Sequence, residues 1–88
     1  MKVLKFGAIW CTECIVMKSI WDEIEDEIFD FDTEYFDADE HQDIFAEHEV
    51  ETIPTYVFLD DGGNEVERLK GIQNKDDIID IINENLEQ

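Results

Sequence analysis

The part of this sequence most able to do chemistry is a pair of cysteines separated by two residues. Cys11 and Cys14 flank Thr12 and Glu13. The apolar run before the pair predicts a strand, and the pattern after it predicts a helix. We therefore expect Cys11 at the helix N-terminus, where unpaired backbone N–H groups favour its thiolate, and Cys14 in the first turn. In that arrangement Cys11 attacks a disulfide and Cys14 resolves the mixed disulfide that forms.

A zinc site and a pair of inert cysteines are the alternative interpretations of this motif. Zinc needs about four ligands, and the chain has only two cysteines. His41 and His48 stand seven residues apart on one expected helix. This spacing separates them by roughly 10 Å along its axis, too far for one ion. We expect both histidines to flank the apolar side formed by Ile44 and Phe45, and we expect no metal and no organic cofactor. A zinc ion shared by two copies of the chain is the one metal site left open.

The rest of the sequence supplies the elements that must position the pair. Apolar, β-branched and alternating runs predict four strands, at residues 3–9, 31–37, 55–59 and 65–70. Apolar stripes and caps predict three helices: one from the cysteines to Ile28, one from the N-cap Asp39 to about Glu49, and one after the N-cap Asn74. In the last strand Val66 and Leu69 fall out of phase, which favours a bulge.

This order of elements, β-α-β-α-β-β-α, predicts the fold class. The first two strands are joined by a helix and should be parallel, whereas the last two form an antiparallel hairpin. The expected class is α/β, with a four-stranded mixed sheet flanked by helices, and the expected domain covers residues 1–88.

The composition limits the partners of the protein. Its 25 acidic and 6 basic residues give a formal charge of −19. Nucleic acids and anionic membranes both need a basic face, so we exclude both as partners. A protein with this charge repels its own copies, which favours a monomer, or it meets basic partners. We find no signal peptide and no apolar run approaching the ~18 residues of a membrane span. We therefore expect a cytoplasmic protein, in a compartment that keeps thiols reduced.

Pro54 is a second feature of interest, because it is the only proline and directly precedes an expected strand. Proline lacks the N–H that a strand ladder needs, so it belongs at a strand start or on an edge strand. By itself this position indicates nothing more than the start of a strand.

Taken together, the two features resemble the thioredoxin family over nearly the whole chain. Trp10 and the Cys-x-x-Cys pair match the active-site motif of that family, and Ile53-Pro54-Thr55 matches its cis-proline loop. The resemblance implies a thioredoxin fold in which the Ile53–Pro54 bond is cis and Pro54 packs beside the cysteines. It also implies that Ile53 offers its backbone to an extended substrate segment, and that Trp10 forms part of an apolar platform around Cys11.

Four features depart from the usual pattern of the family. The usual first strand and helix are missing, so this is a minimal version nearer a glutaredoxin in length. The Thr12-Glu13 spacer replaces Gly-Pro, and Ser19 stands where a kinking proline is common. Lys5 stands where a buried acid is usual, and Tyr35 where a lysine usually faces that acid. These departures bear on the redox potential and on the reductase rather than on exchange chemistry.

Lys5 and Glu13 are therefore candidate modulators of the cysteine pair. The charge of Glu13, about 7 Å from the developing thiolate, opposes its formation, although Glu13 also simply suits the first turn of a helix. For Lys5 the resemblance leaves two roles open. Its ammonium group acts on the proton of Cys14, or it pairs with an acid such as Glu34 while its stem lies along the core.

These observations predict an oxidoreductase that reduces disulfides in protein substrates and is recharged by a thiol reductase. A glutathione-dependent, glutaredoxin-like protein is one alternative, although the carboxylates of glutathione need a basic patch that this acidic chain has few lysines to form. A thioredoxin-fold binding or redox-sensing module without catalytic turnover is the other alternative.

Overall fold

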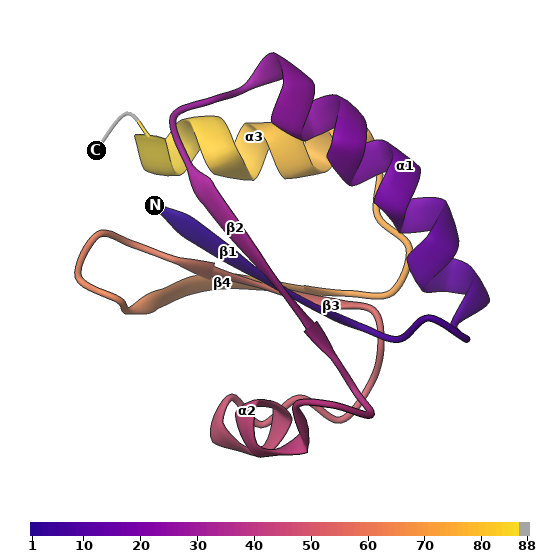
Figure 1. Cartoon of the computed structure of the whole chain (residues 1–88). Coiled ribbons are helices and arrows are strands. Elements are labelled where there is room, and N and C mark those ends of the chain that lie inside the picture. Colours follow the sequence, from indigo (N-terminus) through magenta and orange to yellow (C-terminus); the bar gives the residue numbers. More distant parts are fainter. Residues whose placement is uncertain (87–88) are drawn as a thin grey trace.

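The computed structural model describes residues 1–86, and its elements follow the expected order (Figure 1). Its strands are β1 (Lys2–Gly7), β2 (Asp32–Asp37), β3 (Thr55–Leu59) and β4 (Glu65–Lys70). Its helices are α1 (Thr12–Glu27), α2 (Gln42–Glu47) and α3 (Lys75–Leu86). The strands form one sheet in the order β2-β1-β3-β4. Within it β1 is parallel to β2 and antiparallel to β3, and β3 and β4 are antiparallel. The predicted fold class is confirmed, while the last two residues of the expected domain, 87–88, lie outside the described residues.

The sheet carries a hydrophobic core on each face. Helices α1 and α3 cover one face, and α2 covers the other (Figure 1). Because side chains alternate along a strand, Val3 of β1 packs toward α1 and α3, whereas Leu4 and Phe6 belong to the other core. The larger core contains Val3, Met17, Trp21, Ile24, Tyr56, Phe58, Ile78 and Ile82. The apolar stripe predicted for the first helix is therefore the surface that α1 buries.

Strand β1 ends earlier than the sequence predicted. It stops at Gly7, and the chain then turns through Ile9 and Trp10 toward α1. Ala8 is buried, but Ile9 is 81% exposed and Trp10 is 64% exposed. The apolar run continues past the strand because its last residues lie on the surface beside the cysteines rather than in the core.

The predicted N-cap of the second helix is wrong, whereas that of the third is confirmed. His41 precedes α2 and makes no capping hydrogen bond through its side chain. Asp39 lies in the turn after β2, where its N–H donates to Asp37 Oδ1 at 2.8 Å. Asn74, in contrast, caps α3, because its Oδ1 accepts a hydrogen bond from the Asp76 N–H at 2.8 Å.

Both histidines lie half-buried against aromatic rings of the smaller core. The His41 ring is 5.4 Å from that of Phe36, and the His48 ring is 5.8 Å from that of Phe6. This arrangement confirms their expected place beside the apolar side of α2. The helix itself ends at Glu47, two residues before the predicted end near Glu49. No three His, Cys, Asp or Glu side chains within residues 1–86 are grouped so that they could hold a metal ion.

The bulge expected in the last strand is also present. Phe58 of β3 faces Glu67 of β4, but the next residue, Leu59, faces Glu65. Val66 is therefore the extra residue in β4, which explains the break in alternation.

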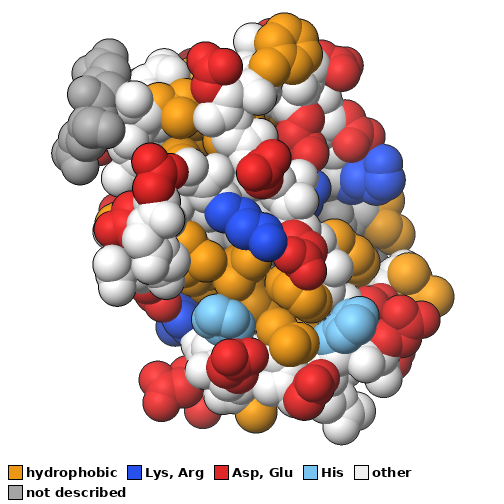
Figure 2. All heavy atoms as spheres, turned by 60° about the vertical axis from the view of Figure 1, so that its left-hand side comes forward, with side chains coloured by type: hydrophobic (Ala, Val, Ile, Leu, Met, Phe, Trp, Pro, Cys, Tyr) orange, Lys and Arg blue, Asp and Glu red, His pale blue; other side chains and the backbone are white. Residues whose placement is uncertain are grey.

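Nearly all of the positive charge is held in ion pairs on an otherwise acidic surface. Five of the six basic side chains make such pairs: Lys2–Glu34, Lys5–Glu25, Lys18–Asp22, Arg68–Glu65 and Lys75–Glu27. On the face shown in Figure 2, carboxylates are spread around a band of apolar side chains, and the two histidines border that band. None of the helices within residues 1–86 is long and apolar enough to span a membrane.

Lys5 lies on the α1 side of the sheet, in a polar cluster next to the larger core. Its Nζ is 3.1 Å from Glu25 Oε2, and it lies 5.6 Å from the centroid of the Trp21 ring. The other oxygen of Glu25 accepts a hydrogen bond from Thr33 Oγ1 at 2.6 Å. A lysine is thus tolerated under α1 because a carboxylate of that helix faces it.

Lys5 is paired with an acid, as one of its two expected roles requires, but the acid is Glu25 and not the example Glu34, and the strand register explains why. Lys5 stands opposite Tyr35 in the parallel ladder of β1 and β2. Glu34 is the neighbour of Tyr35 in β2, so it points to the opposite face of the sheet. There Glu34 pairs with Lys2 at 2.6 Å.

Replacing Lys5 by Met tests the contribution of this cluster to stability. We expect Lys5→Met to lower the free energy of unfolding by about 1 kcal/mol, because Glu25 loses its cation and Trp21 its cation–π contact. Lys18→Met is the matched control, since the Lys18–Asp22 pair is exposed, and it should change stability by less than about 0.5 kcal/mol. Urea unfolding of both variants measures the difference. If Lys5→Met and wild type had equal free energies of unfolding, the Lys5–Glu25 pair would contribute nothing to stability.

Candidate active site

The cysteine pair lies where β1 gives way to α1, as predicted. Cys11 is the N-cap of α1, in an extended conformation with φ −89° and ψ 113°. Its Sγ accepts a hydrogen bond from the Cys14 N–H at 3.2 Å. Both cysteines are free thiols, and both are half-buried. A backbone N–H aimed at the Cys11 sulfur stabilises negative charge on it, which suits a nucleophilic thiolate.

Cys14 lies in a different environment, which keeps its sulfur protonated. Burial, the hydrogen bond with Cys11 and the charge of Glu13 together raise the pKa of the Cys14 thiol from 9.0 to about 12. Burial is the largest of these causes, and the exposed carboxylate of Glu13 is the smallest. Cys14 is therefore a thiol at neutral pH and must lose a proton before it can attack.

Exposed apolar side chains surround the cysteines. Ile9 is 81% exposed, Trp10 64% and Ile15 60%, although all three are large and apolar. The Trp10 indole Nε1 donates a hydrogen bond to Asp39 Oδ2 at 2.9 Å, which fixes its ring beside the start of α1. A patch of this kind marks a contact surface. The spacing of Asp39 predicted a helix cap and gave no sign of this contact, which joins residues far apart in the chain.

The loop before β3 reaches the same site. The Ile53–Pro54 peptide bond is cis, as the resemblance implied. The Pro54 carbonyl accepts a hydrogen bond from the Gly71 N–H at 2.8 Å, and the Thr55 hydroxyl donates to the Thr52 carbonyl at 2.7 Å. Pro54 and Cys14 line the same groove. The structure therefore brings together the two sequence features that suggested the family.

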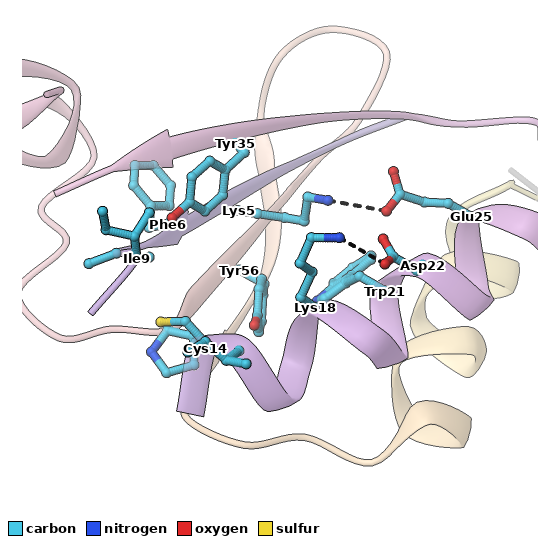
Figure 3. A pocket seen from close by; sticks show the side chains of 14 residues that line it. Lys5, Phe6, Ile9, Cys14, Lys18, Trp21, Asp22, Glu25, Tyr35 and Tyr56 are labelled. Carbon is cyan, nitrogen blue, oxygen red and sulfur yellow. Dashed lines mark hydrogen bonds and ion pairs between the residues drawn. The ribbon is translucent and has the colours of Figure 1, made fainter. Parts of the chain in front are cut away.

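This groove, of about 570 Å³, runs from Cys14 beneath α1 along β1 and β2 (Figure 3). The Tyr35, Tyr56 and Trp21 side chains line it, together with Lys5 and several residues of α1. Figure 3 shows that the Lys5 ammonium group points along the groove toward Glu25, away from Cys14. Lys5 thus lies in the groove of Cys14 while its charge is directed to another partner.

Comparison with known proteins identifies the family. The Thioredoxin family model matches residues 1–84. A thioredoxin of Mycoplasmoides gallisepticum is 33% identical over 60 residues, which are 68% of this chain and 60% of that protein. A thioredoxin of Chlamydia caviae is 29% identical over 82 residues, which are 93% of this chain and 79% of that protein. The chain thus spans less than two thirds of the first relative and more than three quarters of the second.

A solved structure shows the same architecture. A mutant thioredoxin from Halobacterium salinarum aligns with 96% of this chain and 73% of its own length, with a TM-score of 0.88 and 27% identity. The family model, the shared fold and the Cys-x-x-Cys pair at the start of α1 agree with one another. The chain therefore belongs to the thioredoxin family.

Proposed function

We propose that this chain reduces disulfide bonds in protein substrates, with Cys11 as the attacking thiol and Cys14 as the resolving thiol. One observation carries the proposal: Cys11 Sγ is the N-cap acceptor of α1, 3.2 Å from the Cys14 backbone nitrogen. This contact supports the assignment, because a sulfur at a helix N-terminus is favoured as a thiolate and the second cysteine lies within the first turn.

The reaction proceeds in two exchange steps. The Cys11 thiolate attacks one sulfur of a substrate disulfide, and the other substrate sulfur leaves as a thiolate that takes up a proton. Cys14 then loses its proton and attacks Cys11 Sγ, which breaks the bond to the substrate and releases a second thiol. The protein is left with a Cys11–Cys14 disulfide, and a thiol reductase returns it to the dithiol form.

Trp10, Ile53 and Pro54 form the surface that holds the substrate. Trp10 supplies exposed apolar area, and the backbone of Ile53 pairs with an extended segment on either side of the substrate disulfide. The position of Pro54 in the groove of Cys14 supports this assignment. The few basic side chains are mostly paired with carboxylates, so the surface presents a large excess of negative charge. Substrate segments that carry basic residues are therefore favoured. We place this activity in the cytoplasm, in a monomeric protein.

The acidic surface argues against a glutathione-dependent activity. The carboxylates of glutathione need free cations, but the two lysines that line the groove, Lys5 and Lys18, are paired with Glu25 and Asp22. A binding or sensing module without turnover is the second alternative, and a turnover assay separates it from an enzyme.

Insulin reduction by dithiothreitol is that assay. The wild-type protein should accelerate the precipitation of insulin chains, and Cys11→Ser should abolish the acceleration because no attacking thiol remains. Cys14→Ser, reduced and then mixed with insulin after removal of dithiothreitol, should instead accumulate a mixed disulfide between Cys11 and insulin, visible by mass spectrometry, because no resolving thiol or added reductant breaks it. A wild-type protein that folds but gives no acceleration would be a binding module rather than a reductase.

Selective alkylation tests the assignment of the two thiols. A brief treatment of the reduced protein with iodoacetamide at neutral pH should label Cys11. Cys14 should stay unlabelled because its pKa is raised to about 12, so its thiolate becomes abundant only in strongly alkaline solution. Peptide mapping locates the label, and Cys11→Ser should remain nearly unlabelled under the same conditions. Preferential labelling of Cys14 would reverse the roles.

The role of Glu13 is measurable by the same chemistry. Glu13→Gln removes a negative charge next to the pair, so alkylation of Cys11 near neutral pH should become about two- to threefold faster at low ionic strength. The gain should shrink in about 0.5 M salt, because ions screen an exposed charge. Glu23→Gln, an exposed acid further along α1, is the matched control and should leave the rate unchanged. Identical rates for wild type and Glu13→Gln would remove Glu13 from the mechanism.

A further inference from the structure

A small gap beside Gly7 brings the Cys14 sulfur and the Tyr35 hydroxyl together. A methyl group built on Gly7 would lie 3.1 Å from Cys14 Sγ, 3.3 Å from Tyr35 Cε1 and 3.4 Å from the Tyr35 hydroxyl oxygen. Both polar atoms therefore border the same space, and any side chain at position 7 would occupy it. The glycine keeps the gap open.

Few other groups in the groove are placed to donate a hydrogen bond to the Cys14 sulfur. Figure 3 shows the hydroxyl of Tyr35 at the same end of the groove as Cys14, while Lys5 and Lys18 extend toward carboxylates of α1. The Tyr56 hydroxyl also points toward this end of the groove (Figure 3), but Tyr56 is only 3% exposed, its ring packs 5.1 Å from that of Trp21, and its hydroxyl is not among the atoms nearest the gap at Gly7. The titratable and charged groups that face Cys14 or Tyr35 come from every neighbouring element: Lys5 on β1, Tyr35 and Asp37 on β2, Glu40 after β2, Tyr56 on β3, and Cys11, Glu13, Lys18, Asp22 and Glu25 at or on α1.

The chemistry of the resolving step needs a hydrogen-bond donor at this place. Cys14 must become a thiolate in an environment that favours its neutral form. A hydroxyl that keeps its own proton can stabilise that thiolate by donating to it. Burial, together with the negative charge of Asp37, raises the pKa of Tyr35 above its usual value, so its phenol is a donor throughout the neutral range.

We propose that the Tyr35 hydroxyl donates a hydrogen bond to the Cys14 sulfur across the gap at Gly7, directly or through one water molecule, as Cys14 resolves the mixed disulfide. The inference rests on the proposed function of the cysteine pair. In this step the Cys14 S–H bond breaks and its proton passes to solvent. The Cys14–Cys11 disulfide bond forms, and the bond between Cys11 and the substrate sulfur breaks. The substrate thiolate then takes a proton from solvent, and Tyr35 ends the step unchanged.

Stopped-flow reaction with 5,5′-dithiobis(2-nitrobenzoate) separates the two thiols. Attack by Cys11 releases the first thionitrobenzoate in a phase that depends on reagent concentration. Attack by Cys14 on the mixed disulfide releases the second in a phase that does not. We expect Tyr35→Phe to slow the second phase about tenfold near neutral pH, the effect of losing one hydrogen bond to a charged group. It should also move the pH profile of that phase to higher pH, and it should leave the first phase unchanged.

Tyr56→Phe is the matched control, because it removes the other phenolic hydroxyl of the groove. In Tyr56→Phe the rate constant of the second phase should stay within about twofold of the wild-type value. The pH profile is the decisive reading, since a merely structural loss would not shift it. Either an unchanged second phase in Tyr35→Phe or an equal slowing in Tyr56→Phe would overturn the proposal for Tyr35. Both of those results would leave two phases and hence the proposed function intact, whereas the absence of a second phase in wild type would refute the function itself.

Discussion

The hydrogen bond from the Cys14 N–H to Cys11 Sγ is the contact around which the site is organised. A helix begins with backbone N–H groups that lack partners, and a side chain of the preceding residue usually satisfies one of them. In this protein a sulfur atom takes that place, so the atom that caps α1 is also the proposed nucleophile. The Cys11 N–H in turn donates to the Ala8 carbonyl at 3.2 Å, which ties the cap to the end of β1. Any shift of β1 against α1 would therefore move the reactive sulfur.

In the groove behind this contact, the charged side chains are paired with one another at the end remote from Cys14, although the protein has a net charge of −19. The cations of the groove are Lys5 and Lys18, and both are neutralised by carboxylates of α1. Near Cys14 the lining is mostly aromatic and aliphatic, so the half-buried thiol loses part of its contact with water without gaining a charged partner. The two sulfurs therefore differ electrostatically: Cys11 Sγ accepts a hydrogen bond from the N–H at the start of α1, whereas Cys14 Sγ lies in a mostly apolar lining that includes the Tyr35 hydroxyl. Under the proposed function, such different environments give the two thiols their order of reaction.

The sequence alone predicts the features of this site that depend on local pattern. The apolar stripe of α1 and the cap at Asn74 each depend on residues close together in the sequence, and the structure confirms both. Features that depend on contacts between distant segments were not predictable in this way. Asp39 has the spacing of a helix cap, but its carboxylate accepts a hydrogen bond from Trp10. The partner of Lys5 is Glu25, which is brought to it by the packing of a helix on the sheet.

The cis bond before Pro54 and the gap at Gly7 are two further features that local sequence pattern does not predict. The cis bond before Pro54 was implied by family resemblance and not by the residues themselves, since one proline at a strand start fits either isomer. Gly7 is significant for the side chain that it lacks, and an absent side chain leaves no hydrophobic or polar signal in a sequence pattern. Its neighbours Cys14 and Tyr35 could be recognised only from their distances in the folded chain.

The two outer strands of the sheet have a consequence for behaviour at high concentration. Strands β2 and β4 are its edges, and unpaired edges are templates for adding strands from other molecules. Exposed carboxylates stand along both, at Asp32 and Glu34 on one edge and at Glu65 and Glu67 on the other. Glu34 and Glu65 are paired with Lys2 and Arg68, so Asp32 and Glu67 are the carboxylates whose like charges would meet in edge-to-edge pairing of two copies. The bulge at Val66 also interrupts the ladder that a new strand would extend. The edge carboxylates and the bulge thus oppose pairing along the sheet edges, and the exposed apolar residues around Cys11 are the surface on which contact with another molecule is least opposed by charge.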